Sequence, residues 1–316
     1  MRIAHLPVNP ANQAWTLAKA QRRLGHEATV FSRDNPWKFS RDIVLPDTRG
    51  PFQVNVGLLQ LWKQLQDFDV LHVHGGIRRG SVFYPLFKKM SGRELVIHYH
   101  GSETRNGTGL YWQNTADALF YTPPDIKFYL PERARWLPQA VDMDGALHAP
   151  EPRPVNSKRR PVIVHFSTNE ANKGTTNVVR LFEETFPESF GEHGPDCSCY
   201  HGGDGSAVLW VFRKPLDRTR ALSIMQNADI IIDQVTSFGI YGAVAAEAMA
   251  LGRPVMASSN QGFYGRDCPV FWPSPTMLEK LVRDSDLRFR ASLEGMEYAK
   301  RVHDPLVVAQ RALDAY

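Results

Sequence analysis

The sequence predicts an α/β protein with two doubly wound parallel sheets, and three observations predict it. Short β-branched segments alternate with helix-like segments through both halves, as in parallel βαβ units. The length of 316 residues is enough for two domains with separate cores. A proline-rich, charged stretch at 147–161 interrupts the alternation and indicates an extended linker. We therefore expect domains at 1–150 and 151–303, and a terminal helix at 304–316 that crosses back to the first domain.

The elements follow from hydrophobic periodicity and from helix-stop signals. In the first half, a helix with an apolar stripe from Ala14 to Leu24 ends at Gly25. The strands of this half are expected at 2–6, 27–31, 69–74, 94–100 and 118–122. In the second half, strands are expected at 162–166, 208–212 and 229–235, and helices at 175–186, 216–226, 243–251 and 305–315.

Composition and charge exclude several classes of protein. The net charge is only +4, from 37 basic and 33 acidic residues, and no basic stripe predicts a nucleic-acid groove. No apolar run approaches the roughly 18 residues that span a bilayer, so we expect a cytoplasmic protein. Weak association with the inner membrane face is an alternative, through Arg78, Arg79 and the apolar-basic stretch 83–89.

The three cysteines do not form a disulfide framework. Cys197 and Cys199 are flanked by His193 and His201, but this spacing is tighter than that of zinc sites. We expect a loop with reduced thiols here, and no metal site.

The segment from Ser237 to Pro254 carries the clearest functional signal. A buried strand is followed by Gly239 and Gly242, which open an alanine-rich helix. A strand, a glycine turn and a helix N-terminus form a natural anion site, because free amides and the helix dipole face the same point. Glu247 lies within that helix, where its carboxylate could accept hydrogen bonds from ribose hydroxyls. This segment predicts a nucleotide site.

Glu247 to Val255, after its glycine-rich turn, resembles the donor-binding segment of the retaining glycosyltransferase family 4. The resemblance implies the GT-B fold, in which two facing Rossmann-like domains enclose a cleft. The segment 165–175 is similar to the family segment ending in Lys-Gly, so Lys173 would contact the donor diphosphate. The donor-binding residues implied are Gly239, Ile240, Tyr241, Gly242, Ala243, Lys173 and Glu247. Because they follow a predicted strand, Arg213 or Lys214 would supply a second positive charge.

His98 to Arg105 resembles the His-x-His-Gly-Ser turn of some family-4 enzymes. By this match His100 approaches the transferred sugar, whereas His98 is structural. Together with Lys173 and Glu247, His100 completes the expected catalytic set. The residues expected on the acceptor side are His74, Gly75, Gly101, Ser102, Glu103 and Arg105.

Three departures from the family pattern stand out. Gly239 occupies the position of the first acid in the family's E-x7-E pair. The arginine that usually precedes the lysine loop is missing from 167–169, and 7–13 replaces the usual glycine pair after the first strand.

The resemblance implies a hexosyltransferase-like enzyme that transfers sugar with retention from a UDP, GDP or ADP sugar. No metal or other cofactor is required in the family's front-face mechanism, and the acceptor is not indicated. Two alternatives remain open: a nucleotide-sugar epimerase on the same fold, or a non-enzymatic module that binds a nucleotide sugar or a glycan.

Overall fold

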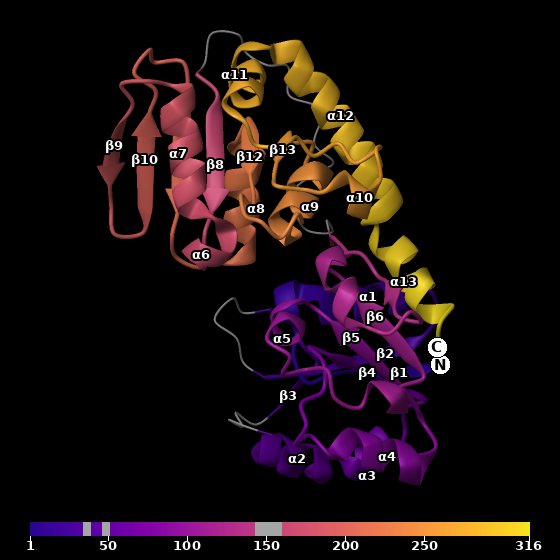
Figure 1. Cartoon of the computed structure of the whole chain (residues 1–316). Helices are drawn as coiled ribbons and strands as arrows, with labels where there is room; N and C mark the ends of the chain where they lie inside the picture. Colours follow the sequence, from indigo (N-terminus) through magenta and orange to yellow (C-terminus); the bar gives the residue numbers. More distant parts are fainter. Residues whose placement is uncertain (34–38, 46–50, 143–159) are drawn as a thin grey trace. The chain divides into compact units, whose positions relative to one another are not determined.

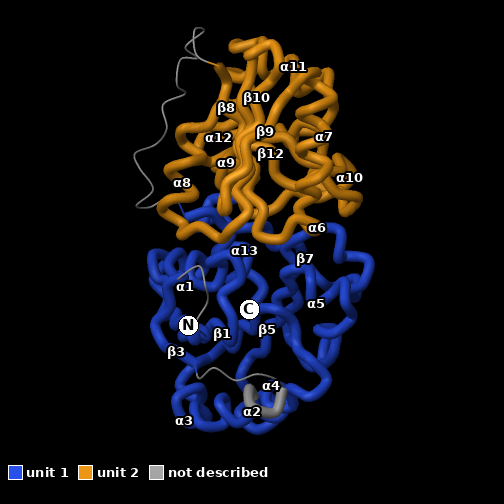
Figure 2. The backbone as a smooth tube through the Cα atoms, turned by 90° about the vertical axis from the view of Figure 1, so that its left-hand side faces the viewer, with its two compact units in different colours: residues 1–142, 303–316 blue, residues 143–302 orange. Residues whose placement is uncertain are grey.

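The computed structural model describes residues 1–33, 39–45, 51–142 and 160–316. It divides into two compact units (Figure 2). Unit 1 contains 1–142 and 303–316, and unit 2 contains 143–302. Most of the expected linker, and the expected boundary at 150, lie outside the described residues.

Unit 1 is built on a parallel sheet with the strand order β3-β2-β1-β4-β5-β6-β7 (Figure 1). Its strands are β1 (Arg2–Leu6), β2 (Glu27–Ser32), β3 (Ile43–Val44), β4 (Val70–His74), β5 (Glu94–Tyr99), β6 (Ala118–Tyr121) and β7 (Arg135–Trp136). Its helices are α1 (Gln13–Arg23), α2 (Pro51–Gln60), α3 (Trp62–Leu65), α4 (Phe83–Ser91), α5 (Ser102–Arg105) and α13 (Pro305–Leu313), with short 3₁₀ turns at Pro10–Asn12, Gln113–Thr115 and Pro124–Tyr129.

Helices cover both faces of this sheet, so its central strands are buried on both sides. On one face, Leu58, Leu65 and Phe87 of α2, α3 and α4 enter one core. On the other face, Leu17 of α1 and Ala309 of α13 enter a second core. Helix α13 begins at a cap in which Asp304 accepts hydrogen bonds from two backbone amides of the first turn.

Unit 2 has the strand order β13-β12-β8-β11-β10-β9. Its strands are β8 (Val162–Phe166), β9 (Phe190–His193), β10 (Cys197–His201), β11 (Val208–Phe212), β12 (Ile230–Ile232) and β13 (Val255–Met256). Its helices are α6 (Glu170–Lys173), α7 (Thr175–Thr185), α8 (Arg218–Asn227), α9 (Ala243–Ala250), α10 (Gln261–Tyr264), α11 (Pro275–Arg283) and α12 (Ser285–Val302).

Two sequence predictions for unit 2 are wrong. The expected loop around Cys197 and Cys199 is strand β10, which pairs antiparallel with both β9 and β11, so this sheet is mixed rather than parallel. This hairpin was not predicted because strand β9 is exposed throughout and carries no apolar alternation. Lys173 ends α6, and Gly174 separates it from α7, which begins at the expected residue Thr175.

Candidate functional site

The strongest candidate site in unit 2 lies where strand β12 leads into helix α9. Gly242 is the N-cap of α9 and offers no side chain, so the first-turn amides have no side-chain cap. Gly239 has φ +69, and its carbonyl accepts a 2.8 Å hydrogen bond from the amide of Asn260. The glycine turn is therefore ordered and left-handed at Gly239, as a tight turn before a helix requires.

Asp233, which the sequence analysis did not single out, occupies the centre of this turn. Its side chain is fully buried. One carboxylate oxygen lies 2.6 Å from Nζ of Lys173, and the other accepts a 2.6 Å hydrogen bond from the amide of Gly242. The Gly242 amide was expected to bind phosphate, but here Asp233 already uses it. The signal was the Asp-Gln pair that directly follows the buried strand.

Lys173 is held beside the N-terminus of α9 by backbone contacts. Its carbonyl accepts a 3.1 Å hydrogen bond from the amide of Val235, just after β12. A Cβ added to Gly242 would lie 3.2 Å from the Lys173 ammonium. A lysine and a helix N-terminus are both positive, so an anion must lie between them, and the Asp233 carboxylate is that anion.

The next residue, Gly174, explains the Lys-Gly pair. It has φ +66, and a Cβ there would lie 2.0 Å from the carbonyl oxygen of Val235. Only glycine fits this position.

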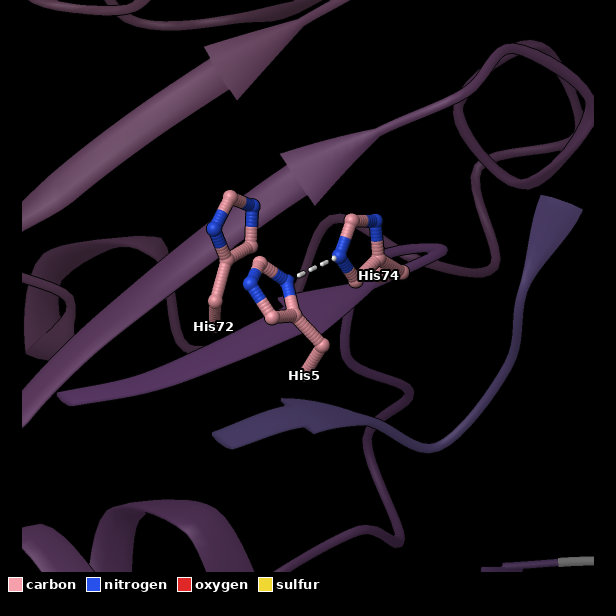
Figure 3. Close-up of side chains that lie close together, drawn as sticks. All are labelled: His5, His72 and His74. Atoms are coloured by element: carbon pink, nitrogen blue, oxygen red, sulfur yellow. Dashed lines mark hydrogen bonds between the residues drawn. The ribbon is translucent and has the colours of Figure 1, made fainter. Parts of the chain in front are cut away.

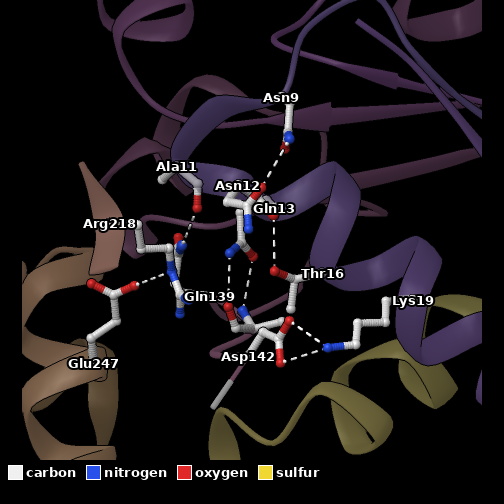
Figure 4. Close-up of polar contacts among 11 residues, drawn as sticks. Asn9, Ala11, Asn12, Gln13, Thr16, Lys19, Gln139, Asp142, Arg218 and Glu247 are labelled. Atoms are coloured by element: carbon white, nitrogen blue, oxygen red, sulfur yellow. Dashed lines mark hydrogen bonds and ion pairs between the residues drawn. The ribbon is translucent and has the colours of Figure 1, made fainter. Parts of the chain in front are cut away.

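Glu247 pairs with a residue that the sequence analysis missed. Nε of Arg218, at the start of α8, lies 3.2 Å from its carboxylate (Figure 4). Burial raises the pKa of Glu247, and the charge of Arg218 opposes that rise. The side chain remains 20% exposed, so it can still meet a ligand. A lone arginine at a helix start carries no motif that would have revealed this pair.

The remaining residues expected to bind the donor have different environments. Ile240 and Tyr241 are buried, and the Tyr241 ring stacks on Tyr264 with centroids 4.2 Å apart. Their side chains therefore support the turn, whereas Ala243 begins α9. Arg213 forms an ion pair with Glu170 of α6, so its positive charge is already paired in this structure.

In unit 1, His74 and His100 come together as expected for one site. His74 ends β4, His100 follows β5, and their facing ring nitrogens lie 3.0 Å apart. Gly75 and Gly101 follow them with φ +91 and +127, conformations that favour glycine.

The other residues expected on the acceptor side lie in short helix α5. The Glu103 carboxylate accepts a hydrogen bond from the backbone amide of His100, and Ser102 is exposed. Arg105 forms a bidentate pair with Asp125, at 2.7 and 2.9 Å. The structure thus gives Glu103 and Arg105 roles in holding this loop.

Further histidines surround His74 that the sequence analysis either did not consider or took as structural. His5 of β1, His72 of β4 and His98 of β5 lie on the same face (Figure 3 shows His5, His72 and His74). Burial lowers the pKa of every member, to about 4 for His5 and about 3 for His100. The signal was the H-x-H spacing at the ends of two strands, which places both histidines of each pair on one face.

Two groups in this cluster have ring nitrogens within 4.8 Å of one another. They are His5, His72 and His74, and His74, His98 and His100. Among the described residues, these histidines have the spacing that a metal ion would need.

In comparisons with known proteins, residues 11–142 match the model of Glycosyltransferase Family 4. A search of curated proteins finds no match.

Solved structures match over nearly the whole chain. One is Anabaena Alr3699/HepE in complex with UDP, with a TM-score of 0.67, 12% identity and 99% of both chains covered. Another is an alpha-glucosyltransferase in complex with UDP and a 13-mer DNA, with a TM-score of 0.66, 13% identity, and 99% and 98% covered. A third is the lipopolysaccharide outer core galactosyltransferase WaaB, with a TM-score of 0.59, 11% identity, and 100% and 99% covered. The chain has the GT-B fold. In GT-B terms, units 1 and 2 are its two Rossmann-like domains.

Proposed function

We propose that this GT-B protein is a glycosyltransferase that takes a hexose from a nucleotide diphosphate sugar and transfers it with retention. The observation that carries the proposal is the Lys173 ammonium, fixed beside the amide end of α9 at the carboxyl ends of β8 and β12. In open α/β sheets, ligands bind at this edge. A cation and free amides together suit a diphosphate.

In this proposal the donor binds in unit 2. Lys173 offsets the negative charge that builds on the leaving diphosphate. The first-turn amides of α9, from Ala243 onward, receive a phosphate, since Asp233 uses the Gly242 amide. Glu247 accepts hydrogen bonds from the ribose, and Arg213 lends a second positive charge once it leaves Glu170.

The acceptor side lies in unit 1, at His74, Gly75, His100 and the Gly101–Arg105 loop. His100 faces the transferred sugar, where exclusion of water strengthens each electrostatic contact. The leaving phosphate deprotonates the acceptor, so the reaction uses no metal and no cofactor beyond the donor. The domain limits proposed are 1–150 and 151–303, with 304–316 completing the first domain.

The neighbouring structures support UDP as the first nucleotide to test. HepE has been solved with UDP and with UDP-glucose. The experiment is the thermal shift of this protein with UDP, GDP, ADP and their sugar conjugates. Mass action predicts about 2.7 kcal/mol of stabilisation at a hundred times the dissociation constant. A selective shift with one base supports the donor site; no shift with any of them contradicts it.

Turnover separates the proposal from its alternatives. A donor that binds and is never consumed, across glycan, lipid-linked and small-molecule acceptors, would favour a non-enzymatic binding module. Release of free nucleotide diphosphate without a glycosylated product would favour an epimerase.

We expect the change Glu247→Ala to raise the donor dissociation constant about tenfold. The reason is the loss of one charged hydrogen bond to ribose, about 1.4 kcal/mol. Isothermal titration with the nucleotide measures it. Because Glu247 also pairs with Arg218, the control is Arg218→Met, which breaks the pair and keeps the carboxylate. Unchanged affinity in folded Glu247→Ala, or an equal loss in Arg218→Met, contradicts the ribose assignment.

Contact with a membrane is a second element of the proposal. Helix α4 and the residue before it expose Val82, Leu86 and Met90, which are 50%, 44% and 66% exposed and lie four residues apart. Lys89 adds a positive charge nearby, whereas Lys88 pairs with Asp117. No helix among the described residues has the length and apolarity to cross a bilayer. Peripheral binding to the inner face predicts retention on anionic vesicles and loss of retention in Leu86→Glu.

A further inference from the structure

The five clustered histidines of unit 1 are joined through a buried glutamine. Parallel register sets His5 beside His72 and His74 beside His98. Gln21 of α1 is fully buried against this face. Its Oε1 lies 2.7 Å from Nε2 of His5, and its Nε2 donates to the hydroxyl of Tyr316 at 3.1 Å.

Gln21 fixes the direction of the hydrogen bonds that lead to His100. An amide oxygen only accepts, so Nε2 of His5 carries the proton. A neutral imidazole has one N–H, so Nδ1 of His5 accepts from Nε2 of His74, 3.0 Å away. By the same rule Nδ1 of His74 accepts from Nε2 of His100, also at 3.0 Å. His100 therefore keeps an unprotonated Nδ1.

The second branch runs in the same direction. The Tyr316 hydroxyl lies 2.5 Å from Nδ1 of His72. A contact this short suits an O–H donor better than an N–H donor, so the hydroxyl donates. Nε2 of His72 then donates to Nδ1 of His98 at 3.3 Å, and Nε2 of His98 donates to Oγ1 of Thr122 at 2.8 Å.

The reverse direction conflicts with this geometry. If the Gln21 amide were flipped, its oxygen would face Tyr316 and accept the hydroxyl proton. Nδ1 of His72 would then have to donate to the Tyr316 oxygen across 2.5 Å, which is short for an N–H donor. The amide also stops proton conduction between the branches, because passing a proton would require its imidic acid form. The network therefore sets tautomers and does not carry protons from end to end.

His100 is the accessible end of this network. The other four histidines are at most 1% exposed, whereas His100 is partly exposed. Its backbone amide is held by Glu103, and its Nε2 by His74.

We propose that Gln21, His5 and His74 are positioning residues that hold His100 as the Nε2–H tautomer, so that its Nδ1 accepts a hydrogen bond from a hydroxyl of a bound sugar. The sugar contact rests on the function proposed above; the tautomer does not. An acceptor nitrogen selects for a hydroxyl donor at this point, and a neutral ring avoids a buried charge beside the reacting sugar.

The first test needs no substrate. Imidazole ¹⁵N spectra of the free protein at pH 7.5 distinguish protonated from unprotonated ring nitrogens, with histidine variants for assignment. The expected result is one Nε2–H tautomer at His5, His74 and His100. A His100 ring protonated at Nδ1, or a mixture of tautomers, would overturn the proposal. Stoichiometric binding of Zn²⁺ or Co²⁺ by His5 and His74, replacing these hydrogen bonds, would overturn it as well and identify a metal centre.

The second test compares two variants that each remove one end of a branch. Gln21→Met removes the acceptor that directs His5, so we expect mixed tautomers at His100. The loss of one hydrogen bond to the sugar should lower kcat/KM for the donor roughly tenfold. Thr122→Val removes the acceptor at the end of the other branch and should leave the His100 tautomer unchanged. Equal effects of both variants on His100 would overturn the proposal. If Gln21→Met does not fold, the wild-type spectra still decide. Correct tautomers in a protein that transfers no sugar would refute the proposed function and leave the tautomer assignment intact.

Discussion

Lowering the pH from 7.5 to 5.5 should destabilise unit 1 by several kcal/mol. Burial lowers the pKa of His5, His72, His74, His98 and His100 in the folded state. In the unfolded chain each titrates near 6.5, so below that pH the unfolded state binds more protons. This stability is fully present above pH 6.5 and is lost as the pH falls toward the folded pKa values, about 4 for His5 and about 3 for His100. A buried histidine that stays neutral one pH unit below its unfolded pKa costs about 1 kcal/mol.

This loss is comparable to the whole stability of a typical domain, so acid unfolding near pH 5 is the expected outcome. Denaturant titrations at several pH values measure the free energy of unfolding, and its slope with pH counts the protons taken up. Replacing buried His98 with Gln should lower that slope by about one proton. A free energy of unfolding that stays flat between pH 7.5 and 5.5 would show that these rings are charged or solvated in the folded state.

Gly174→Ala should destabilise unit 2 by about 4 kcal/mol and abolish tight donor binding. The left-handed backbone at φ +66 costs about 1 kcal/mol for alanine. The new Cβ would also lie 2.0 Å from the carbonyl of Val235, and making room adds up to about 3 kcal/mol. Because the Val235 amide donates to the Lys173 carbonyl, the shift moves Lys173 away from Asp233.

The matched control is Gly107→Ala in unit 1. Gly107 also has φ +66, but a Cβ there meets nothing within 4 Å. It should therefore show the backbone cost alone, about 1 kcal/mol. Denaturant unfolding of both variants and nucleotide titration of Gly174→Ala are the measurements. If both substitutions destabilise the protein equally, the segment after β12 moves away from Gly174 at no cost in free energy. That result would contradict the proposal that this contact fixes Lys173.

Much of the fold was predictable because it is encoded locally. Periodicity placed the strands and helices that it predicted within a few residues, and Gly242 was correctly expected to open α9, but helices α2, α11 and α12 were not predicted. The exceptions have local causes too. Strand β9 is exposed throughout, so it carries no alternation, and Phe190–His193 was not expected to be a strand.

The partners of the site residues were not predictable in this way. Motif spacing placed Lys173 and Glu247 near the ends of strands, but no motif links them to Asp233 and Arg218, which meet them across 60 and 29 positions of sequence. The amide of Gly242 was expected to be open for phosphate because nothing in the sequence shows which carboxylate reaches it.

The sequence by itself determined the βα rhythm, the glycine turns and the H-x-H pairs, since backbone preference and side-chain period act over a few residues. Only the tertiary structure decided that His5 stands beside His72, that Gln21 orients them, and that Asp233 neutralises Lys173. The physical reason is that strand register and helix packing bring together groups far apart in the chain, and each buried polar group must then find its partner among whatever that packing supplies.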